Sequence, residues 1–408
     1  AGESLSCRWS RESRFRAASA HVLHSTGGRP VQFQRMTADD ERKEMTPAHT
    51  LPGEYFTSPD ILAEELRGIF RRNWVCVDRA DRLAQAGDYL LADVGEQSVI
   101  VLRDGSGQLR ALHNVCRHRG TRLCSEPHGR LRETIQCPYH AWTYGLDGCL
   151  IGAPHMDAVP GFAREDYPLR AVALQTWEGF LFLNLAAGPE PVDDALASLQ
   201  PSTSRFGLPG LRSARRIEYV VQANWKLVAL NYSECLHCPV IHPELAKLAP
   251  YQSGTNDLAE GPILGGYMTI NRKGGSMTAS GRSCGAPIPG LPEADHGRVY
   301  YYTVFPNLLL SLHPDYVMSH TLWPVDAAHT RVVCEWLFPP QTLDDPESNP
   351  EDAIEFWDTT NRQDWRICEQ NQEGIASPAY TPGPYSENES LLAAWDSEYL
   401  RQLGGAYR

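Results

Sequence analysis

Two short segments, each with one cysteine and one histidine, constrain this sequence more than any other feature. The first is Asn-Val-Cys-Arg-His-Arg-Gly, which contains Cys116 and His118. The second is Cys-Pro-Tyr-His-Ala-Trp, which contains Cys137 and His140. Thiolate and imidazole groups are the side-chain ligands that zinc and iron centres use. The two segments therefore predict one metal centre shared between two loops.

The alternation of cysteine and histidine favours a 2Fe–2S cluster over zinc. Two loops that each offer one thiolate and one imidazole can place both cysteines on one iron and both histidines on the other. The imidazoles then raise the reduction potential to the range of about −150 to +300 mV. Zinc is the alternative, but zinc fingers usually pair Cys with Cys and His with His along the chain. We therefore predict a cluster bound by Cys116, His118, Cys137 and His140.

A second group of candidate ligands follows in the C-terminal half. The sequence predicts a helix from Asn224 to His237, which would place Glu234 on the same face as His237 because the two are three residues apart. Pro239 then breaks the helix, so the chain can curve and bring His242 beside His237. Two histidines and a carboxylate on iron(II) leave open positions for dioxygen and substrate. The alternative is a purely structural pair of histidines near a proline.

The third ligand of such an iron is expected on the segment 351–374. This segment has acids near its start and Gly374 near its end, a pattern that predicts a long helix. Its spacing does not choose among the acids, each of which could simply be a solvated residue. The candidates are Glu355, Asp358, Asp364 and Glu369.

The motifs resemble those of the Rieske-type ring-hydroxylating oxygenase α subunits, and the likeness runs from about Leu51 onward. The two Cys/His segments are similar to the Rieske motif of that family. Asn-Trp-Lys followed by Glu-x-x-His-x4-His is similar to its iron motif. Gln-Asp-Trp around Asp364 resembles the segment with the third ligand, so the resemblance selects Asp364. By the same resemblance Trp142 and Tyr144 surround the cluster without binding it.

The resemblance also implies an architecture and an assembly. The expected fold is α+β, with a Rieske β-sandwich domain followed by a helix-grip catalytic domain in which an antiparallel sheet packs against long helices. Subunits would form a head-to-tail homotrimer. Glu234 would bridge the interface, accepting hydrogen bonds from a cluster ligand (His118 or His140) of one subunit and from His237 of the next. A carboxylate suits this position because it accepts from both rings and fixes their orientation.

Composition and local patterns give expected boundaries. An Arg-rich leader over 1–35, disordered or not native, precedes Met36, with a transit peptide as the alternative. We expect a helical segment over 36–72, the Rieske domain over 73–190 and the mononuclear iron domain over 191–408. Ser-Pro-Asp at 58–60 should cap a helix between 50 and 72. Runs rich in Val, Leu and Phe predict strands over 89–93, 98–103, 109–114, 179–185, 216–221, 300–305 and 332–338.

The net charge of the sequence and the motifs that it lacks limit the kinds of partner that the protein can have. A net charge of −13 argues against nucleic-acid binding, and the apolar runs are far shorter than the roughly 20 residues of a membrane helix. Gly-rich phosphate loops are missing from the sequence, so electrons from NAD(P)H must arrive through a separate ferredoxin or flavin reductase. The eleven cysteines follow no disulfide framework, which fits reduced thiols in the cytoplasm.

Two further segments resemble glycine betaine and related quaternary ammonium demethylases: Glu-Cys-Leu-His-Cys-Pro and the tail 380–386. This resemblance implies oxidative N-demethylation with dioxygen, although the region 245–298 departs from those enzymes. Aromatic faces bind methylammonium groups best. The candidates are Trp323, Trp336, Tyr267, Tyr300, Tyr301 and Tyr302. The alternatives are an aromatic-ring hydroxylating dioxygenase and an electron carrier that keeps the cluster without catalysis.

Overall fold

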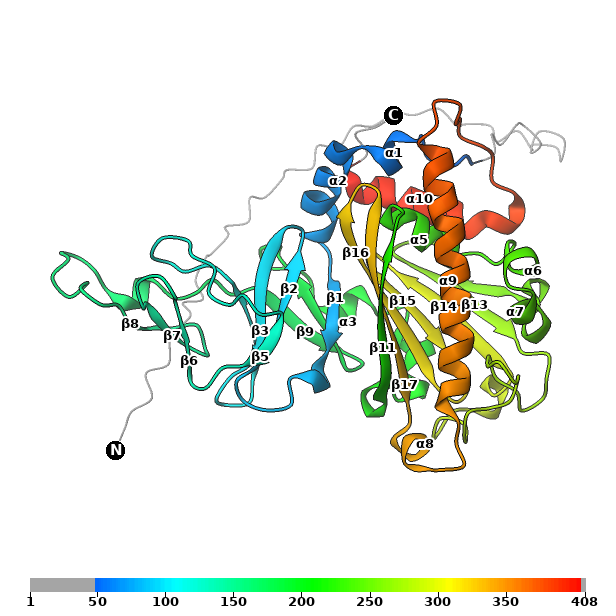
Figure 1. Cartoon of the computed structure of the whole chain (residues 1–408), viewed down its shortest axis with the longest axis horizontal. Coiled ribbons are helices and arrows are strands. Elements are labelled where there is room, and N and C mark those ends of the chain that lie inside the picture. The colour runs from blue at the N-terminus through cyan, green and yellow to red at the C-terminus, as the bar shows by residue number, and fades with distance from the viewer. Residues whose placement is uncertain (1–47, 405–408) are drawn as a thin grey trace, which may run out of the picture. The chain divides into compact units, whose positions relative to one another are not determined.

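The structure is a computed structural model that describes residues 48–404. The predicted leader over 1–35 lies outside the described residues, and the expected domain boundaries remain predictions. Helices and antiparallel sheets alternate along the described chain (Figure 1). In this part of the chain no helix has the length and hydrophobicity that a membrane crossing needs.

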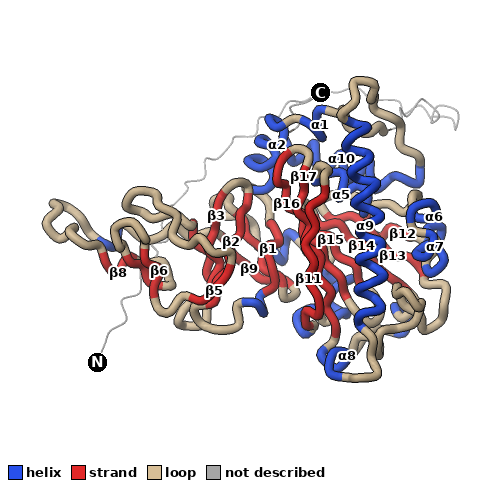
Figure 2. Tube along the Cα trace, viewed as in Figure 1, coloured by secondary structure: helices blue, strands red, loops and turns tan. Residues whose placement is uncertain are grey.

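Small antiparallel sheets make up the first half of the described chain (Figure 2). One contains β1 (Val75–Arg79), β10 (Phe180–Asn184) and β9 (Ala173–Trp177). The next contains β4 (Leu109–His113), β3 (Gln97–Arg103), β2 (Asp88–Val94) and β5 (His128–Arg130). The third contains β6 (Thr134–Gln136), β7 (Thr143–Gly145) and β8 (Leu150–Gly152). The predicted strands of this half are thus present, with ends that differ by one or two residues.

A seven-stranded antiparallel sheet dominates the second half, in the order β11-β17-β16-β15-β14-β13-β12. Its strands are β11 (Arg212–Val221), β12 (Thr255–Leu258), β13 (Ile263–Thr269), β14 (Arg298–Val304), β15 (Leu308–Leu312), β16 (Val317–Asp326) and β17 (His329–Phe338). The long helix α9 (Pro350–Ile375) lies across one face of this sheet (Figure 1). This is the predicted helix-grip arrangement.

Shorter helices flank the sheet. The predicted N-terminal helix is present in three pieces, and Ser58 caps the second by accepting from the Ile61 N–H at 3.4 Å. These pieces are α1 (Glu54–Thr57), α2 (Pro59–Glu65) and the π-helix η2 (Leu66–Phe70). The others are α3 (Val192–Ala195), α4 (Gln200–Thr203), α5 (Trp225–Tyr232), α6 (Cys238–Ile241), α7 (Pro243–Leu248), α8 (Pro340–Asp344) and α10 (Ser390–Leu403).

One predicted helix is shorter than expected. The sequence predicted a single helix from Asn224 to His237, but α5 ends at Tyr232. Pro239 lies in the first turn of the separate helix α6, a position that tolerates proline, whereas inside one continuous helix its ring would clash with the carbonyl of Cys235 four residues earlier. Glu234 and His237 therefore lie in a turn between α5 and α6, and not on one helix face as predicted.

A buried ion pair connects three helices behind this turn. The Glu65 carboxylate of α2 lies 2.6 Å from Lys226 Nζ and accepts hydrogen bonds from Trp225 Nε1 and from Tyr399 Oη of α10. All four residues are fully buried. Burial lowers the pKa of Lys226, and the charge of Glu65 opposes this effect. The helix that begins the iron motif is thus fixed to both ends of the described chain.

We expect Lys226→Met to lower the free energy of unfolding by about 3–5 kcal/mol, because it leaves the Glu65 carboxylate buried without its counter-charge. Urea denaturation measures this change. Lys247→Met is the matched control, since Lys247 pairs with Glu244 at the surface and its loss should cost under about 1 kcal/mol. Equal losses in the two variants would contradict the prediction.

Candidate metal centres and substrate cavity

The two Cys/His segments form loops with the same backbone hydrogen bonds. In each loop the cysteine N–H donates at 2.8 Å to the carbonyl five residues later. The carbonyl of Cys116 accepts from Gly120 N–H at 3.0 Å, and that of Cys137 accepts from Ala141 N–H at 3.1 Å. Gly120 and Ala141 both have a positive φ, 76° and 55°. These hydrogen bonds close each loop into a tight turn that contains its histidine.

The four predicted cluster ligands face one another across the two loops. The rings of His118 and His140 have centroids 5.0 Å apart, and both thiols are buried whereas His118 is exposed. Burial alone would raise the pKa of Cys137. Hydrogen bonds from the Tyr139 and His140 backbone, with a contact to Cys116, lower it overall. Thiolate is the ligating form, so this donor set fits a Rieske cluster.

Two aromatic residues pack against these ligands. Trp142 stacks on the His118 ring at 4.8 Å with an interplanar angle of 6°. Tyr144 Oη lies 3.4 Å from Cys116 Sγ and accepts a hydrogen bond from the Arg117 N–H. Hydrogen bonding near the sulfurs is one factor that sets the potential of such a cluster. The surroundings of the loops therefore match what the sequence predicted for Trp142 and Tyr144.

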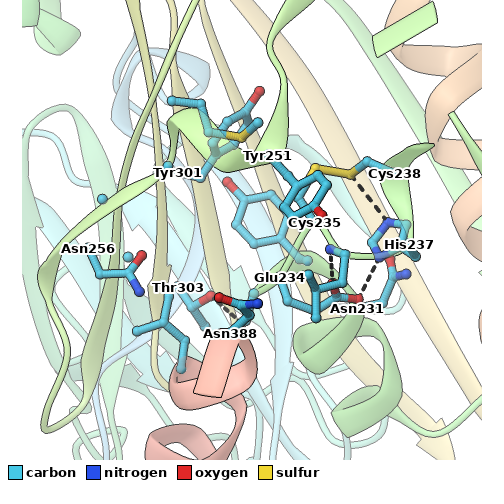
Figure 3. Close-up of a pocket in the computed structure, with 18 of the residues that line it drawn as sticks. Asn231, Glu234, Cys235, His237, Cys238, Tyr251, Asn256, Tyr301, Thr303 and Asn388 are labelled. Atoms are coloured by element: carbon cyan, nitrogen blue, oxygen red, sulfur yellow. Dashed lines mark hydrogen bonds and ion pairs between the residues drawn. A yellow bond between two sulfur atoms is a disulfide. The ribbon is translucent and has the colours of Figure 1, made fainter. Parts of the chain in front are cut away.

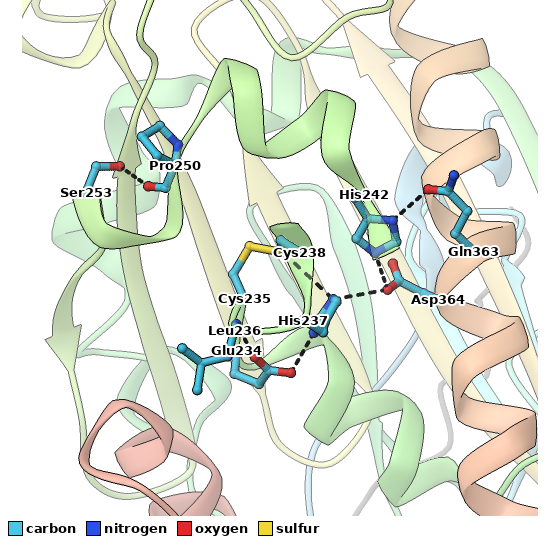
Figure 4. The surroundings of a disulfide bond; sticks show 10 residues. All are labelled: Glu234, Cys235, Leu236, His237, Cys238, His242, Pro250, Ser253, Gln363 and Asp364. Atoms are coloured by element: carbon cyan, nitrogen blue, oxygen red, sulfur yellow. Dashed lines mark hydrogen bonds and ion pairs between the residues drawn. A yellow bond between two sulfur atoms is a disulfide. The ribbon is translucent and has the colours of Figure 1, made fainter. Parts of the chain in front are cut away.

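A second centre lies between the α5–α6 turn and α9. One ligand atom from each of His237, His242 and Asp364 lies within 4.8 Å of the others (Figure 4). Asp364 Oδ1 is 2.7 Å from His242 Nε2 and 3.4 Å from His237 Nε2. Two imidazoles and one carboxylate are the donor set of the non-heme iron(II) oxygenases. The residues present therefore fit iron(II).

The other acids of α9 point elsewhere. Asp358 accepts a hydrogen bond from Tyr219 Oη at 2.6 Å, and Glu369 accepts one from the Gln222 N–H at 3.1 Å. Glu355 is exposed. Of the four candidates that the spacing left open, the structure brings only Asp364 to the histidines.

Both histidines have their second ring nitrogen occupied. His237 Nδ1 donates to Glu234 Oε1 at 2.5 Å, and His242 Nδ1 donates to Gln363 Oε1 at 2.7 Å. An N–H at Nδ1 leaves the lone pair of Nε2 free for a metal. Gln363 entered the prediction only as part of the Gln-Asp-Trp segment, and its contact with His242 was missed, because an amide beside Asp364 carries no signal of its own.

The same contacts control the charge of the site. Burial alone would lower the pKa of His237, but hydrogen bonds with Asp364 and Glu234 outweigh it and raise the pKa to about 9. Burial would raise the pKa of Asp364, and its hydrogen bonds with both histidines lower it overall. Metal binding at this site therefore competes with protonation of His237.

A disulfide joins Cys235 to Cys238 within the same turn (Figure 4). It corrects the expectation of reduced cysteines, which rested on their lack of a framework pattern. The two Cα atoms are 5.0 Å apart, a separation that a disulfide spans. The bridge encloses His237 and directly follows Glu234, and Cys238 Sγ lies 3.8 Å from His237 Nε2. It therefore links the backbone on either side of a predicted iron ligand.

A cavity of about 520 Å³ adjoins this centre (Figure 3). Of the aromatic residues proposed from the sequence, Tyr267 and Tyr301 line it. Three others that line it were missed: Tyr232, Tyr251 and Trp357. The remaining proposed aromatics, Trp323, Trp336, Tyr300 and Tyr302, are not among the described residues of its wall.

Comparisons with known proteins agree with both centres. Residues 73–163 match the Rieske 2Fe-2S domain, and residues 208–405 match the ring hydroxylating alpha subunit (catalytic domain). A glycine betaine monooxygenase oxygenase subunit from Chromohalobacter salexigens is 32% identical over 393 residues, which cover 88% of this chain and 86% of that protein. A chloroplastic choline monooxygenase from Arabidopsis thaliana is 27% identical, over 86% and 82% of the two chains.

Solved structures share the fold. A quaternary ammonium Rieske monooxygenase in complex with L-carnitine superposes with a TM-score of 0.69 at 26% identity, over 87% of this chain and 95% of the other. Naphthalene 1,2-dioxygenase from Rhodococcus sp. gives a TM-score of 0.73 at 20% identity, over 88% and 95% of the chains. The second likeness establishes the arrangement of elements only.

Proposed function

Because this chain belongs to the Rieske-type ring-hydroxylating oxygenase α subunits, which are oxidoreductases, we propose that it is a terminal oxygenase that demethylates a quaternary ammonium compound. Cys116, His118, Cys137 and His140 bind the cluster. His237, His242 and Asp364 bind the mononuclear iron. The names of the relatives support this substrate class over an aromatic ring.

The observation that carries the proposal is the composition of the cavity beside the predicted iron ligands. Aromatic side chains of Tyr251, Tyr301 and Trp357 line it together with the carboxylates of Glu234 and Asp364. A trimethylammonium cation donates no hydrogen bonds and is attracted to aromatic faces by about 0.5–2 kcal/mol per contact. An uncharged aromatic substrate would gain no such cation–π attraction.

The overall reaction balances with one dioxygen and two electrons. The trimethylammonium group, dioxygen, NADH and a proton give a dimethylammonium group, formaldehyde, water and NAD⁺, with electrons delivered by a separate reductase. When bound, the cluster relays single electrons and the iron activates dioxygen. Glu234 and Gln363 orient His237 and His242 through Nδ1, and the cavity wall holds the cation with one methyl toward the ligands.

We further propose a homotrimer in which Glu234 connects the two centres of neighbouring subunits. One Glu234 oxygen accepts from His237 Nδ1, and the other accepts from the Leu236 N–H. The carboxylate side chain is 15% exposed, and His118 is exposed at its loop. A partner imidazole can therefore approach Glu234 without displacing its bond to His237.

We expect the purified protein to be reddish brown and Cys116→Ser to remove this colour, because a hydroxyl does not replace a thiolate on iron. Absorption spectra of anaerobically prepared protein measure the effect. Cys124→Ser is the matched control, since Cys124 is also a buried free cysteine of this region. A colourless wild type that contains zinc would contradict the cluster assignment.

The deciding assay supplies a surrogate reductase, NADH and dioxygen, and compares methylammonium compounds with aromatic acids. Formaldehyde in proportion to oxygen uptake with a methylammonium compound supports the demethylase. Coupled uptake with an aromatic acid alone would favour a ring hydroxylase. An electron carrier is excluded when iron analysis finds one iron beyond the two of the cluster.

A further inference from the structure

We infer that the substrate of this cavity carries no carboxylate: the site fits a trimethylammonium cation whose other end is uncharged, such as an amide or an alcohol. This inference rests on the proposed function and narrows it to one class of quaternary ammonium compound. Its basis is the distribution of charge and of unused polar groups over the cavity wall.

Apart from the histidines, the described charged residues that line the cavity are all negative. Among the described residues that line the cavity are three acids, Glu234, Asp364 and Glu387, and none is Lys or Arg. Glu234 and Asp364 are engaged with the histidines. Glu387 makes no hydrogen bond or ion pair with any other described side chain and is exposed at the wall. A carboxylate in this cavity would thus face Glu387 without a lysine or arginine partner.

The position of Glu387 is fixed by the fold. It begins the short 3-10 helix η9 (Glu387–Glu389), whose first turn is closed by a capping box between Ser386 and Glu389. Ser386 Oγ and its N–H both donate to Glu389 Oε2, at 2.7 and 2.8 Å. The capping box leaves the Glu387 side chain uncommitted at the cavity wall.

Four amide side chains of the wall are also uncommitted. The amides of Asn231, Gln252, Asn256 and Asn388 line the cavity, and none donates or accepts a side-chain hydrogen bond within the described chain. Figure 3 shows Asn256 on the side of the cavity away from His237. A substrate that presents a methyl group to His237 and its fellow ligands can therefore extend its other end toward the Asn256 amide.

The positive charge of the metal centre cannot pair with a carboxylate at the opposite end of the substrate. The methyl group that reacts must lie at His237, His242 and Asp364, so the opposite end extends along the rest of the wall, whose described residues include Glu387 and neutral amides and no lysine or arginine. Removing a carboxylate from water is costly unless a cation pairs with it, whereas an amide or hydroxyl is satisfied by neutral partners. The cavity wall therefore disfavours a substrate whose opposite end carries a negative charge.

The test compares glycine betaine with its primary amide, carbamoylmethyl-trimethylammonium, which has the same heavy-atom shape. Calorimetric titration of the holoenzyme measures binding, and formaldehyde release measures kcat/KM. We expect the amide to bind about tenfold more tightly, the ratio that one unpaired polar or charged group of about 1.4 kcal/mol produces. Equal or tighter binding of glycine betaine overturns the inference.

A charge reversal assigns the effect to Glu387. Glu387→Lys should shift the amide-to-betaine ratio of KM by about fivefold toward glycine betaine, the size expected for reversing one exposed charge. Glu373→Lys makes the same change on the exposed face of α9, outside the cavity wall, and should leave the ratio unchanged. Equal shifts in the two variants would mean that net charge, and not the wall, sets the preference.

The proposed demethylase activity and the inferred preference for an uncharged end can be refuted independently of each other. If both compounds bind with the expected preference but neither yields formaldehyde, the demethylase proposal is wrong and the charge preference stands. If glycine betaine is demethylated as efficiently as its amide, the demethylase proposal stands and the inference about the carboxylate is wrong.

Discussion

Replacing Asp364 with alanine is expected to empty the mononuclear iron site and abolish turnover while the colour of the cluster persists. Asp364 Oδ1 is the one atom that approaches both His237 Nε2 and His242 Nε2. Its loss removes a ligand together with the charge that offsets the metal. Since changes to residues that only support a ligand already cost 10–100-fold in affinity, we expect iron binding to weaken by more than about a hundredfold.

Iron analysis and the cluster spectrum together measure this outcome. The variant should retain the two irons of the cluster and lose the third. Asp358→Ala is the matched control on the same helix, because Asp358 contacts Tyr219 and Arg362 and no candidate ligand. Retention of the third iron by Asp364→Ala, or its equal loss from Asp358→Ala, would refute the ligand assignment.

Glu234→Gln is expected to keep both metals and to lose most multiple-turnover activity, by about a hundredfold or more. Glutamine keeps the size of the side chain, and its Oε1 can still accept from His237 Nδ1. It cannot accept at both ends, and it brings no negative charge to stabilise the transfer between two imidazoles. The proposed contact between subunits is therefore weakened while the ligands stay in place.

Rapid mixing of pre-reduced protein with substrate and dioxygen separates the two roles of Glu234. The single turnover that uses electrons already at the mononuclear iron should survive in the variant, and re-reduction of that iron from the cluster should be slow. Glu244→Gln is the control, because Glu244 belongs to an exposed pair with Lys247 in the adjacent helix. Transfer at the wild-type rate in Glu234→Gln would disprove the bridge.

The two histidines predicted to bind the iron have different acceptors at Nδ1. His237 donates to the carboxylate of Glu234, whereas His242 donates to the neutral amide of Gln363. A charged acceptor makes its imidazole more basic than a neutral one does. The charged acceptor thus belongs to the histidine on the proposed electron path, and the neutral one belongs to the histidine on the buried side against α9.

Sequence reasoning could propose the cluster ligands because both loops are local. Each needs only a cysteine, a nearby histidine and a turn at Gly120 or Ala141, all within six residues. The third iron ligand is not local. Four acids of α9 fit the pattern equally, and only the packing of that helix against α5 brings Asp364 to the histidines.

The aromatic residues of the cavity wall illustrate a second limit of prediction from the sequence. Successive residues of a strand point to opposite faces of a sheet, so Tyr301 cannot share a face with Tyr300 and Tyr302. The alternation is visible in the sequence, but which face meets the cavity depends on where α9 lies. The structure turns Tyr301 toward the cavity, whereas Tyr300 and Tyr302 bond to Asp295 and Asp257.

The tail 380–386, which resembled the demethylases, has mainly a structural role in the described chain. Tyr380 Oη donates to the Leu51 carbonyl, and the Gly383 carbonyl accepts from the Thr50 N–H. The tail therefore fixes the start of the described chain and then leads to Glu387, which lines the cavity. The segment that was interpreted as a sign of the substrate thus acts through the position that it gives to the backbone after it.

Because of the disulfide in the α5–α6 turn, the chemical state of a purified sample depends on whether a reducing agent was added to it. Dithiothreitol, a routine additive, would convert Cys235 and Cys238 into two free thiols next to His237, and thiols are themselves ligands for iron. Batches stored with and without such an additive are then different proteins at this turn. Their specific activities and metal contents belong in separate data sets, with a thiol titration recorded for each.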